Sequence, residues 1–118
     1  MSGISLPVAV EMTSRFRTER ENILVPELRG LGLLPVCETF DRAEIDGLLA
    51  QAGCAKLRIY YGMYADKSVH AVLVGVDADD ADILPAAGAV AANTDEGEII
   101  NDGWRCPPTC PPASVLNG

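Results

Sequence analysis

The stretch CAKLRIYYGMYADKSVHAVLVGVDA, residues 54–78, contains two β-rich runs that predict the centre of the fold. The runs cover residues 55–64 and 69–77, and the polar segment ADKS lies between them. Runs of β-branched and aromatic residues on either side of a short polar turn are typical of an antiparallel hairpin. We therefore predict a central hairpin over about residues 55–77.

The alternation of side chains along this hairpin predicts how its faces are used. In the first run, one face is apolar and the other carries polar and aromatic groups. The apolar face comprises Leu57, Ile59, Tyr61 and Met63, and the other face comprises Lys56, Arg58, Tyr60 and Tyr64. The second run is apolar on both faces, which is typical of a covered strand. Because a hairpin alone is unstable, we expect other elements to hide its apolar faces.

Two helices are predicted before the hairpin. An apolar stripe with a spacing of four predicts a helix over about residues 6–21. The stripe consists of Val8, Met12 and Phe16. Asp41 has the position of a helix N-cap and predicts a second helix over residues 42–52. Short strands are predicted near residues 36–40 and 98–101.

These elements together predict an α+β fold. Two N-terminal helices pack on a small, mainly antiparallel sheet, and a Pro/Cys-rich C-terminal tail, residues 104–118, packs on the same domain. A chain of 118 residues suits one domain, so we assign residues 1–118 to a single unit. Because aromatic residues make up only 5% of the chain, the core is expected to be mainly aliphatic.

The charge balance limits the class of partner. Seventeen acidic and nine basic residues give a net charge of -8, which repels nucleic-acid phosphates and anionic membranes. The N-terminus lacks the basic start and apolar core of a signal peptide, and no run reaches the ~20 apolar residues of a membrane span. We therefore expect a cytoplasmic protein with reduced thiols, no nucleic-acid partner and no membrane.

The predicted strand face formed by Arg58, Tyr60 and Tyr64 is the first candidate binding site. Its aromatic rings suit stacking on bases, but the acidic charge of the chain opposes that use. Tyrosines of this kind more often pack at a protein interface, and a pocket for a small aromatic or anionic ligand is the alternative. We predict an unknown protein or small-molecule partner, with a homo-oligomer as one option.

The remaining polar motifs do not predict catalysis. An acidic cluster follows the second run, but it lacks the glycine and glutamate of a calcium-binding loop and is interpreted as a solvated turn. The cluster contains Asp77, Asp79, Asp80 and Asp82. His70 is the single histidine, and no nucleophile elbow accompanies it. We therefore predict no catalytic residue and no cofactor, and the sequence leans away from an enzyme.

The C-terminal segment WRCPPTCPP, residues 104–112, is the second candidate site. A polyproline helix holds the Cα atoms of Cys106 and Cys110 ~12 Å apart, beyond the ~7 Å limit for a disulfide. A turn through Pro108 would instead bring the thiols together. A stiff structural tail with free or incidentally paired thiols is the leading interpretation, and a disulfide or a metal site is the alternative. Zinc would also need Cys37 and Cys54, whose spacing fits no zinc pattern.

From the second helix onward, the chain resembles a set of short uncharacterised bacterial proteins. The resemblance is carried by LRIYYGMY, by AVLVGVDADDADIL and by the terminal CPPTCP, which match an RIYYG-type strand, an LVGVD-type strand and a CPPxCP motif. No activity or cofactor is established for that set. The resemblance therefore implies only that the hairpin and the cysteine–proline ending belong to one recurring design.

The leading hypothesis for function is a small non-enzymatic binding or protein-interaction module. It is motivated by the absence of any set of nucleophile, base and electrophile in the sequence. The alternative is a thiol site, either a structural metal or a redox disulfide, centred on Cys106 and Cys110.

Overall fold

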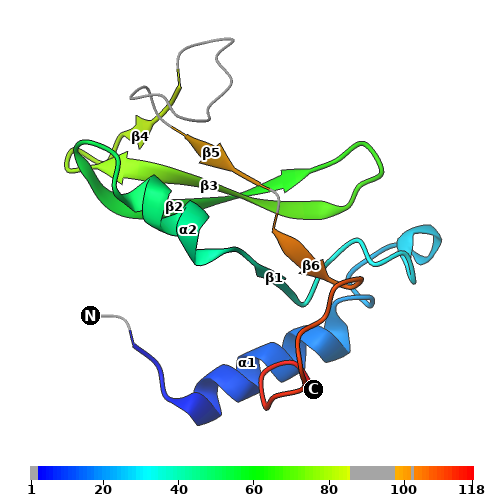
Figure 1. The fold of residues 1–118 in the computed structure, drawn as a ribbon. Coiled ribbons are helices and arrows are strands. Elements are labelled where there is room, and N and C mark those ends of the chain that lie inside the picture. Colours follow the sequence, from blue (N-terminus) through cyan, green and yellow to red (C-terminus); the bar gives the residue numbers. More distant parts are fainter. Residues whose placement is uncertain (1–2, 86–97, 102) are drawn as a thin grey trace.

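The computed structural model describes residues 3–85, 98–101 and 103–118, and it has an α+β fold (Figure 1). The elements in chain order are α1 (Leu6–Glu19), the 3-10 turn η1 (Pro26–Leu28), β1 (Cys37–Thr39), α2 (Arg42–Leu49), β2 (Cys54–Met63), β3 (Val69–Asp77), β4 (Asp82–Ile83), β5 (Ile99–Ile100) and β6 (Trp104–Cys106). The fold class predicted from the sequence is confirmed. The predicted strands near 36–40 and 98–101 correspond to β1 and β5, which are shorter.

The central hairpin is present as predicted. β2 and β3 pair antiparallel, with Ile59 opposite Leu73, and a bulge interrupts the ladder near Lys56. The short strands β4 and β5 both pair antiparallel with β3. Among the described strands, β3 therefore lies inside the sheet and β2 forms its edge.

A second, two-stranded sheet joins the C-terminal segment to the chain before α2. β1 and β6 pair antiparallel, with Cys37 opposite Cys106 and Glu38 opposite Arg105. The Arg105 side chain donates hydrogen bonds to the backbone carbonyl groups of Val69, Gly32 and Leu33 at 3.0–3.1 Å. This arginine therefore ties β6 to the start of β3 and to the loop that precedes β1.

Helix α2 covers one end of the sheet and supplies the core. Leu48 is fully buried and packs with Leu73 and Ile100. Gly75 permits this close approach, because a Cβ atom there would lie 2.9 Å from the side-chain nitrogen of Gln51. The helix ends at Leu49, earlier than the predicted residue 52, and the side chain of its N-cap residue, Asp41, makes no capping hydrogen bond.

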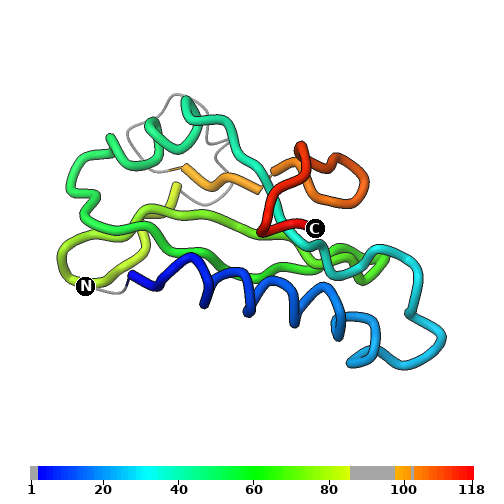
Figure 2. Tube along the Cα trace, turned by 90° about the horizontal axis from the view of Figure 1, so that it is seen from below, coloured from blue at the N-terminus to red at the C-terminus, as the bar shows by residue number. Residues whose placement is uncertain are grey.

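Helix α1 begins where the sequence predicts, but it buries no side chain. The Ser5 hydroxyl accepts a hydrogen bond from the Val8 amide and caps the helix. The helix runs in about the same direction as the hairpin strands (Figure 2), and Figure 1 shows it apart from them, below β1 and β6. The predicted stripe is exposed, with Met12 56% and Phe16 41% accessible. The expectation that both helices pack on the sheet therefore fits α2 and does not fit α1.

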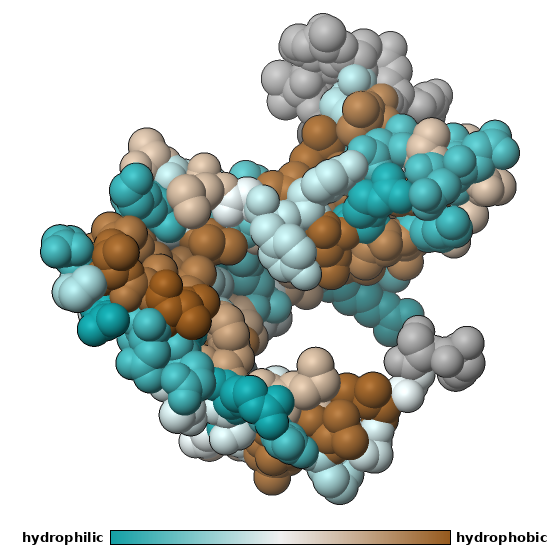
Figure 3. All heavy atoms as spheres, turned by 180° about the vertical axis from the view of Figure 1, so that it is seen from behind, coloured by the Kyte–Doolittle hydropathy of each residue, from teal (hydrophilic) through white to brown (hydrophobic). Residues whose placement is uncertain are grey.

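The prediction that both apolar faces of the hairpin are hidden is correct for β3 and wrong for β2. In β3, Leu73, Val74 and Val76 are buried. In β2, Ile59 is 49% and Tyr61 85% exposed. The reason is the size and position of the helices. The eight-residue α2 reaches only the end of the sheet near Gly75, while the molecule is hollowed between α1 and the sheet (Figure 3).

The core that results is small. Among the residues that the structure describes, seven hydrophobic residues are buried, whereas twenty large ones are exposed. Polar surface alone never covers a protein, but exposed apolar side chains that lie together mark interaction sites. No helix in residues 3–85, 98–101 and 103–118 is both long and apolar enough to cross a membrane.

Candidate functional site

Two of the predicted binding residues, Arg58 and Tyr60, are held by carboxylates of their own chain. The Arg58 guanidinium donates to Asp82 at 2.6 Å and to Asp80 at 2.8 Å, and the Tyr60 hydroxyl donates to Asp82 at 2.5 Å. Asp82 belongs to β4, on the far side of β3 from β2. The two β2 side chains therefore reach across β3, and much of their hydrogen-bonding capacity is already used.

The ionisation of this cluster follows from the same contacts. The hydrogen bond from Tyr60, followed by the contacts with Arg58, lowers the pKa of Asp82 below its ordinary value. The hydrogen bond to Asp82 raises the pKa of Tyr60, because it favours the neutral phenol. The hydrogen bond to Asp82 also raises the pKa of Arg58. All three groups are thereby held in the charge states that bind one another.

We predict that the Tyr60→Phe substitution removes part of the acid sensitivity of the fold. Because the pKa of Asp82 is lower in the folded chain, its contribution to stability is present above the unfolded value near 3.8 and is lost as the pH falls through the folded value. The melting temperature of wild type is therefore expected to exceed that of the variant by a constant margin above about pH 5. The margin should shrink below pH 4. A margin that is independent of pH between 2 and 6 would contradict this assignment.

The third predicted binding residue, Tyr64, lies in a different cluster. Its ring stacks on His70, with ring centroids 3.7 Å apart. The buried Ser68 hydroxyl donates to Asp66 at 2.6 Å and lies 2.9 Å from Nε2 of His70. The side-chain hydrogen bond from Ser68, with the bond from its amide, lowers the pKa of Asp66.

This arrangement differs from that of an activated serine. In a nucleophilic triad the histidine lies between the serine and the acid and removes the hydroxyl proton. Here Ser68 lies between Asp66 and His70, and its proton is directed to the carboxylate. The cluster fixes the turn between β2 and β3, since Asp66 also accepts a hydrogen bond from the Ser68 amide at 2.8 Å.

The acidic segment after β3 forms a turn, as predicted. Asp77 accepts hydrogen bonds from the amides of Asp79 and Ala81 at 2.9 and 3.0 Å. Asp80 adopts a positive φ of 68°. What the sequence did not indicate is the second use of this turn, which presents Asp80 and Asp82 to the basic side chains of β2.

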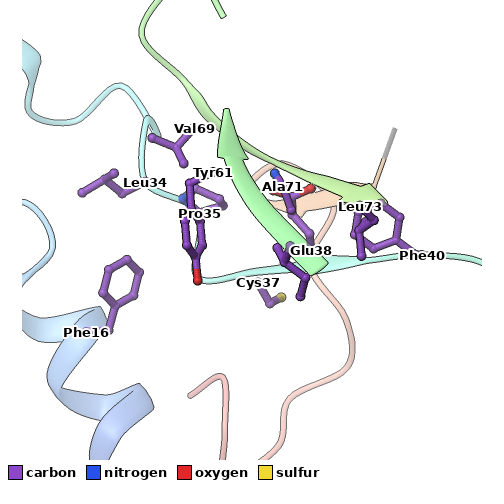
Figure 4. Close-up of a pocket in the computed structure, with 11 residues that line it drawn as sticks. Phe16, Leu34, Pro35, Cys37, Glu38, Phe40, Tyr61, Val69, Ala71 and Leu73 are labelled. Carbon is purple, nitrogen blue, oxygen red and sulfur yellow. Dashed lines mark hydrogen bonds between the residues drawn. The ribbon is translucent and has the colours of Figure 1, made fainter. Parts of the chain in front are cut away.

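An apolar groove of about 500 Å³ lies between α1 and the exposed face of the hairpin. Its sheet side is formed by Ile59, Tyr61, Val69, Ala71 and Leu73, and its other walls include Phe16, Leu34, Pro35, Cys37, Glu38 and Phe40. Figure 4 shows the ring of Phe16 projecting from α1 on the side that faces Tyr61 and Pro35. The groove is therefore bounded on one side by the hairpin. Its other sides are formed by α1, by the loop before β1, and by β1 and the residue that follows it.

Glu38 supplies the charged side chain of this lining. One of its carboxylate oxygens accepts a hydrogen bond from the Ala71 amide at 2.8 Å. The other oxygen is buried without a hydrogen-bond partner in the described part of the chain. Glu38 therefore links β1 to β3, and the lining is mainly apolar, with the Glu38 carboxylate and the free Cys37 thiol among its polar groups.

The C-terminal cysteines form a disulfide, which the sequence left open beside a stiff tail with free or incidentally paired thiols, and the expectation of reduced thiols is wrong for this pair. The Cα atoms of Cys106 and Cys110 are 4.5 Å apart, far closer than a polyproline helix would hold them. The amide of Thr109 donates to the carbonyl of Arg105 at 2.8 Å and closes the turn. Cys37 and Cys54 are free, and no group of three metal-ligating side chains occurs in the described ranges.

No protein-family profile, no curated protein and no solved structure matches this chain. The resemblance to short bacterial proteins stays a prediction.

Proposed function

We propose that this chain is a small protein-interaction module whose binding site is the apolar groove between α1 and β2. The observation that carries the proposal is the exposure of Tyr61, which is 85% accessible although it lies in the wall of an apolar hollow. A large aromatic ring in such a position loses little conformational entropy on binding and buries a large area.

The groove is a better candidate than the face of Arg58, Tyr60 and Tyr64. On that face, Arg58 and Tyr60 bond to carboxylates of the same chain, and Tyr64 stacks on His70. A partner would have to replace these contacts. On the groove face, the side chains of Ile59 and Tyr61 have only water to lose, so covering them is favourable. Binding at the face of Arg58, Tyr60 and Tyr64 stays a prediction.

A protein partner fits the surface better than a small molecule. The groove itself has a volume within the range of ligand pockets, roughly 300–1,000 Å³. The exposed apolar surface extends further, however, to Met63 on β2 and to Met12 on α1. Burying all of it needs a polypeptide that crosses from the sheet to the helix.

Photo-crosslinking tests the proposed function. We expect benzoylphenylalanine in place of Tyr61 to form adducts with a polypeptide, and Ile59→Asp in the same chain to reduce the yield, because a carboxylate in the wall disfavours an apolar partner. The control carries the probe in place of Lys67, in the hairpin turn. A probe at position 61 that captures no polypeptide, or no more than the control, would rule out the groove as the binding site.

A redox disulfide is the second candidate function, and the Cys106–Cys110 bond favours it. Cys106 is buried whereas Cys110 is exposed, so an external thiolate reaches the sulfur of Cys110 first. Attack there forms a mixed disulfide at Cys110 and releases Cys106 as the thiolate.

We predict that the Cys110→Ser substitution lowers the free energy of unfolding by about 2 kcal/mol, the entropy of closing a loop of about five residues. Chemical denaturation measures the loss, and Cys54→Ser is the control because Cys54 is a free thiol outside the loop. After reduction of the wild type, iodoacetamide should modify Cys110 before Cys106. Equal stability of the Cys110→Ser and Cys54→Ser variants would show that the disulfide does not stabilise the fold. Faster labelling of Cys106 would refute Cys110 as the sulfur that an external thiolate attacks.

A further inference from the structure

The single chain exposes more surface than a compact monomer of its mass. Its accessible surface is 8055 Å², whereas a folded monomer of 12.5 kDa is expected to expose about 6,200 Å². Its radius of gyration is 16.4 Å, against about 13.5 Å for a compact domain of this length. A standard interface hides about 800 Å² on each partner. This area is less than half of the excess surface.

Helix α1 has apolar surface on two sides. Phe16 lines the groove that faces the sheet, and it also lines a second hollow of about 300 Å³ together with Met12 and Ile23. A helix of 14 residues is only marginally stable in water unless an apolar side is packed. No side chain of α1 is fully buried within its own chain, so covering the apolar stripe with a second chain would stabilise the helix.

The stripe on α1 is complementary to itself. Val8, Met12 and Phe16 are evenly spaced about Met12. When two copies of the helix pair antiparallel about a two-fold axis at Met12, the large ring of each Phe16 meets the smaller Val8 of the other copy. One surface patch then serves both subunits, as a symmetric dimer requires.

The charges of α1 also permit self-association. The whole chain has a net charge of -8, so two copies repel each other at most approaches. Within α1, two acidic and two basic residues cancel. Glu11 and Arg15 already form an ion pair at 2.7 Å beside the stripe. This helix therefore presents a neutral surface through which two acidic chains can meet.

We infer that the occupant of the groove is a second copy of this chain. In the resulting two-fold dimer, α1 of each subunit packs along the stripe of the other. Phe16 lines both the groove and the second hollow, so the partner helix lies at the mouth of the groove that Ile59 and Tyr61 line. This inference rests on the proposed function, because it names the polypeptide that fills the same groove.

Size-exclusion chromatography with light scattering tests the dimer. Wild type is expected to elute at twice the chain mass of 12.5 kDa at micromolar concentration. Met12→Glu places two carboxylates at the two-fold axis and should weaken dimerisation by about a hundredfold. Thr18→Glu adds the same charge off the stripe and should leave the dimer intact. Met12 is exposed in the single chain, so the variant should keep its fold, which circular dichroism checks.

Disulfide trapping tests the geometry independently of affinity. In a Cys37→Ser, Cys54→Ser background, Met12→Cys is expected to yield a covalent dimer on mild oxidation, because the two-fold axis brings the two thiols together. Thr18→Cys in the same background is expected to stay monomeric. A dimer that survives Met12→Glu, or trapping that favours position 18, would overturn the inference.

The outcomes separate this inference from the proposed function. A chain that stays monomeric at the highest soluble concentration, while the probe at position 61 captures a different polypeptide, overturns the second-copy inference and leaves the proposed function standing. Gly62→Pro removes a backbone donor from the edge strand β2. A dimer that is broken by this variant but not by Met12→Glu pairs through β2 rather than through α1, and it also overturns the second-copy inference. A groove that captures neither the same chain nor another polypeptide overturns both.

Discussion

Replacing Leu48 with alanine is expected to lower the free energy of unfolding by about 3–4 kcal/mol, because it empties the centre of a small core. Leu48 is fully buried and packs with Leu73 and Ile100, and Phe40 and Ile45 pack against this cluster. No other described helix side chain is buried, so little remains to fill the space. Urea denaturation followed by circular dichroism measures the loss.

The neighbouring residue provides the control for this substitution. Leu49 has the same side chain and follows Leu48 in α2, but it is 44% exposed. Leu49→Ala should cost less than about 1 kcal/mol, because little apolar area is returned to water. Equal losses for the two variants would mean that α2 does not pack against the sheet in the way described.

Arg105→Ala is expected to have the second-largest effect, a loss of about 2–4 kcal/mol. The half-buried guanidinium donates three hydrogen bonds to backbone carbonyl groups, and its removal leaves those acceptors without their donor. The bonds reach Gly32, Leu33 and Val69, so the variant should also loosen β6 and the loop before β1. Amide exchange of Val69, whose amide donates to the carbonyl of Leu33, should accelerate.

Arg42 is the control for the arginine. It forms an exposed ion pair with Asp46 at 3.2 Å, and its side chain is 91% accessible. Arg42→Ala should therefore change stability by less than about 0.5 kcal/mol. Arg105→Lys should recover only part of the loss, because an ammonium group lacks the planar fork that reaches several carbonyl groups. A full recovery by lysine would show that charge alone matters at this position.

The local elements were predictable because their signals are local. The alternation in residues 55–77 and the polar turn between the runs specify the hairpin, and the stripe on residues 6–21 specifies a helix. The end of α2 was placed three residues too late, because Ala50 keeps a helical backbone and the chain leaves the helix through a turn that ends at Gly53, where φ is 77°. Short strands such as β4 and β6 depend on their partners and carry little signal of their own.

The candidate site was predictable only in part. The sequence placed Ile59 and Tyr61 on one face of β2, and the structure agrees, but periodicity cannot tell a face buried in the chain from one left open for a partner. The sequence pattern placed Tyr64 in one group with Arg58 and Tyr60. In the structure, Arg58 and Tyr60 bond to Asp82, whereas Tyr64 stacks on His70. Asp82 was missed because its contact depends on β4 pairing with β3, which no spacing in the sequence reveals.

Amide hydrogen exchange of α1 at several protein concentrations distinguishes the dimer from a monomer. We claim that this helix is stabilised by a second chain rather than by its own sheet. Protection across Leu6–Glu19 is predicted to rise steeply with concentration, while the amides of Leu73 and Val74 in β3 stay equally protected throughout. Protection of α1 that is strong at the lowest concentration and does not change on further dilution would contradict the claim.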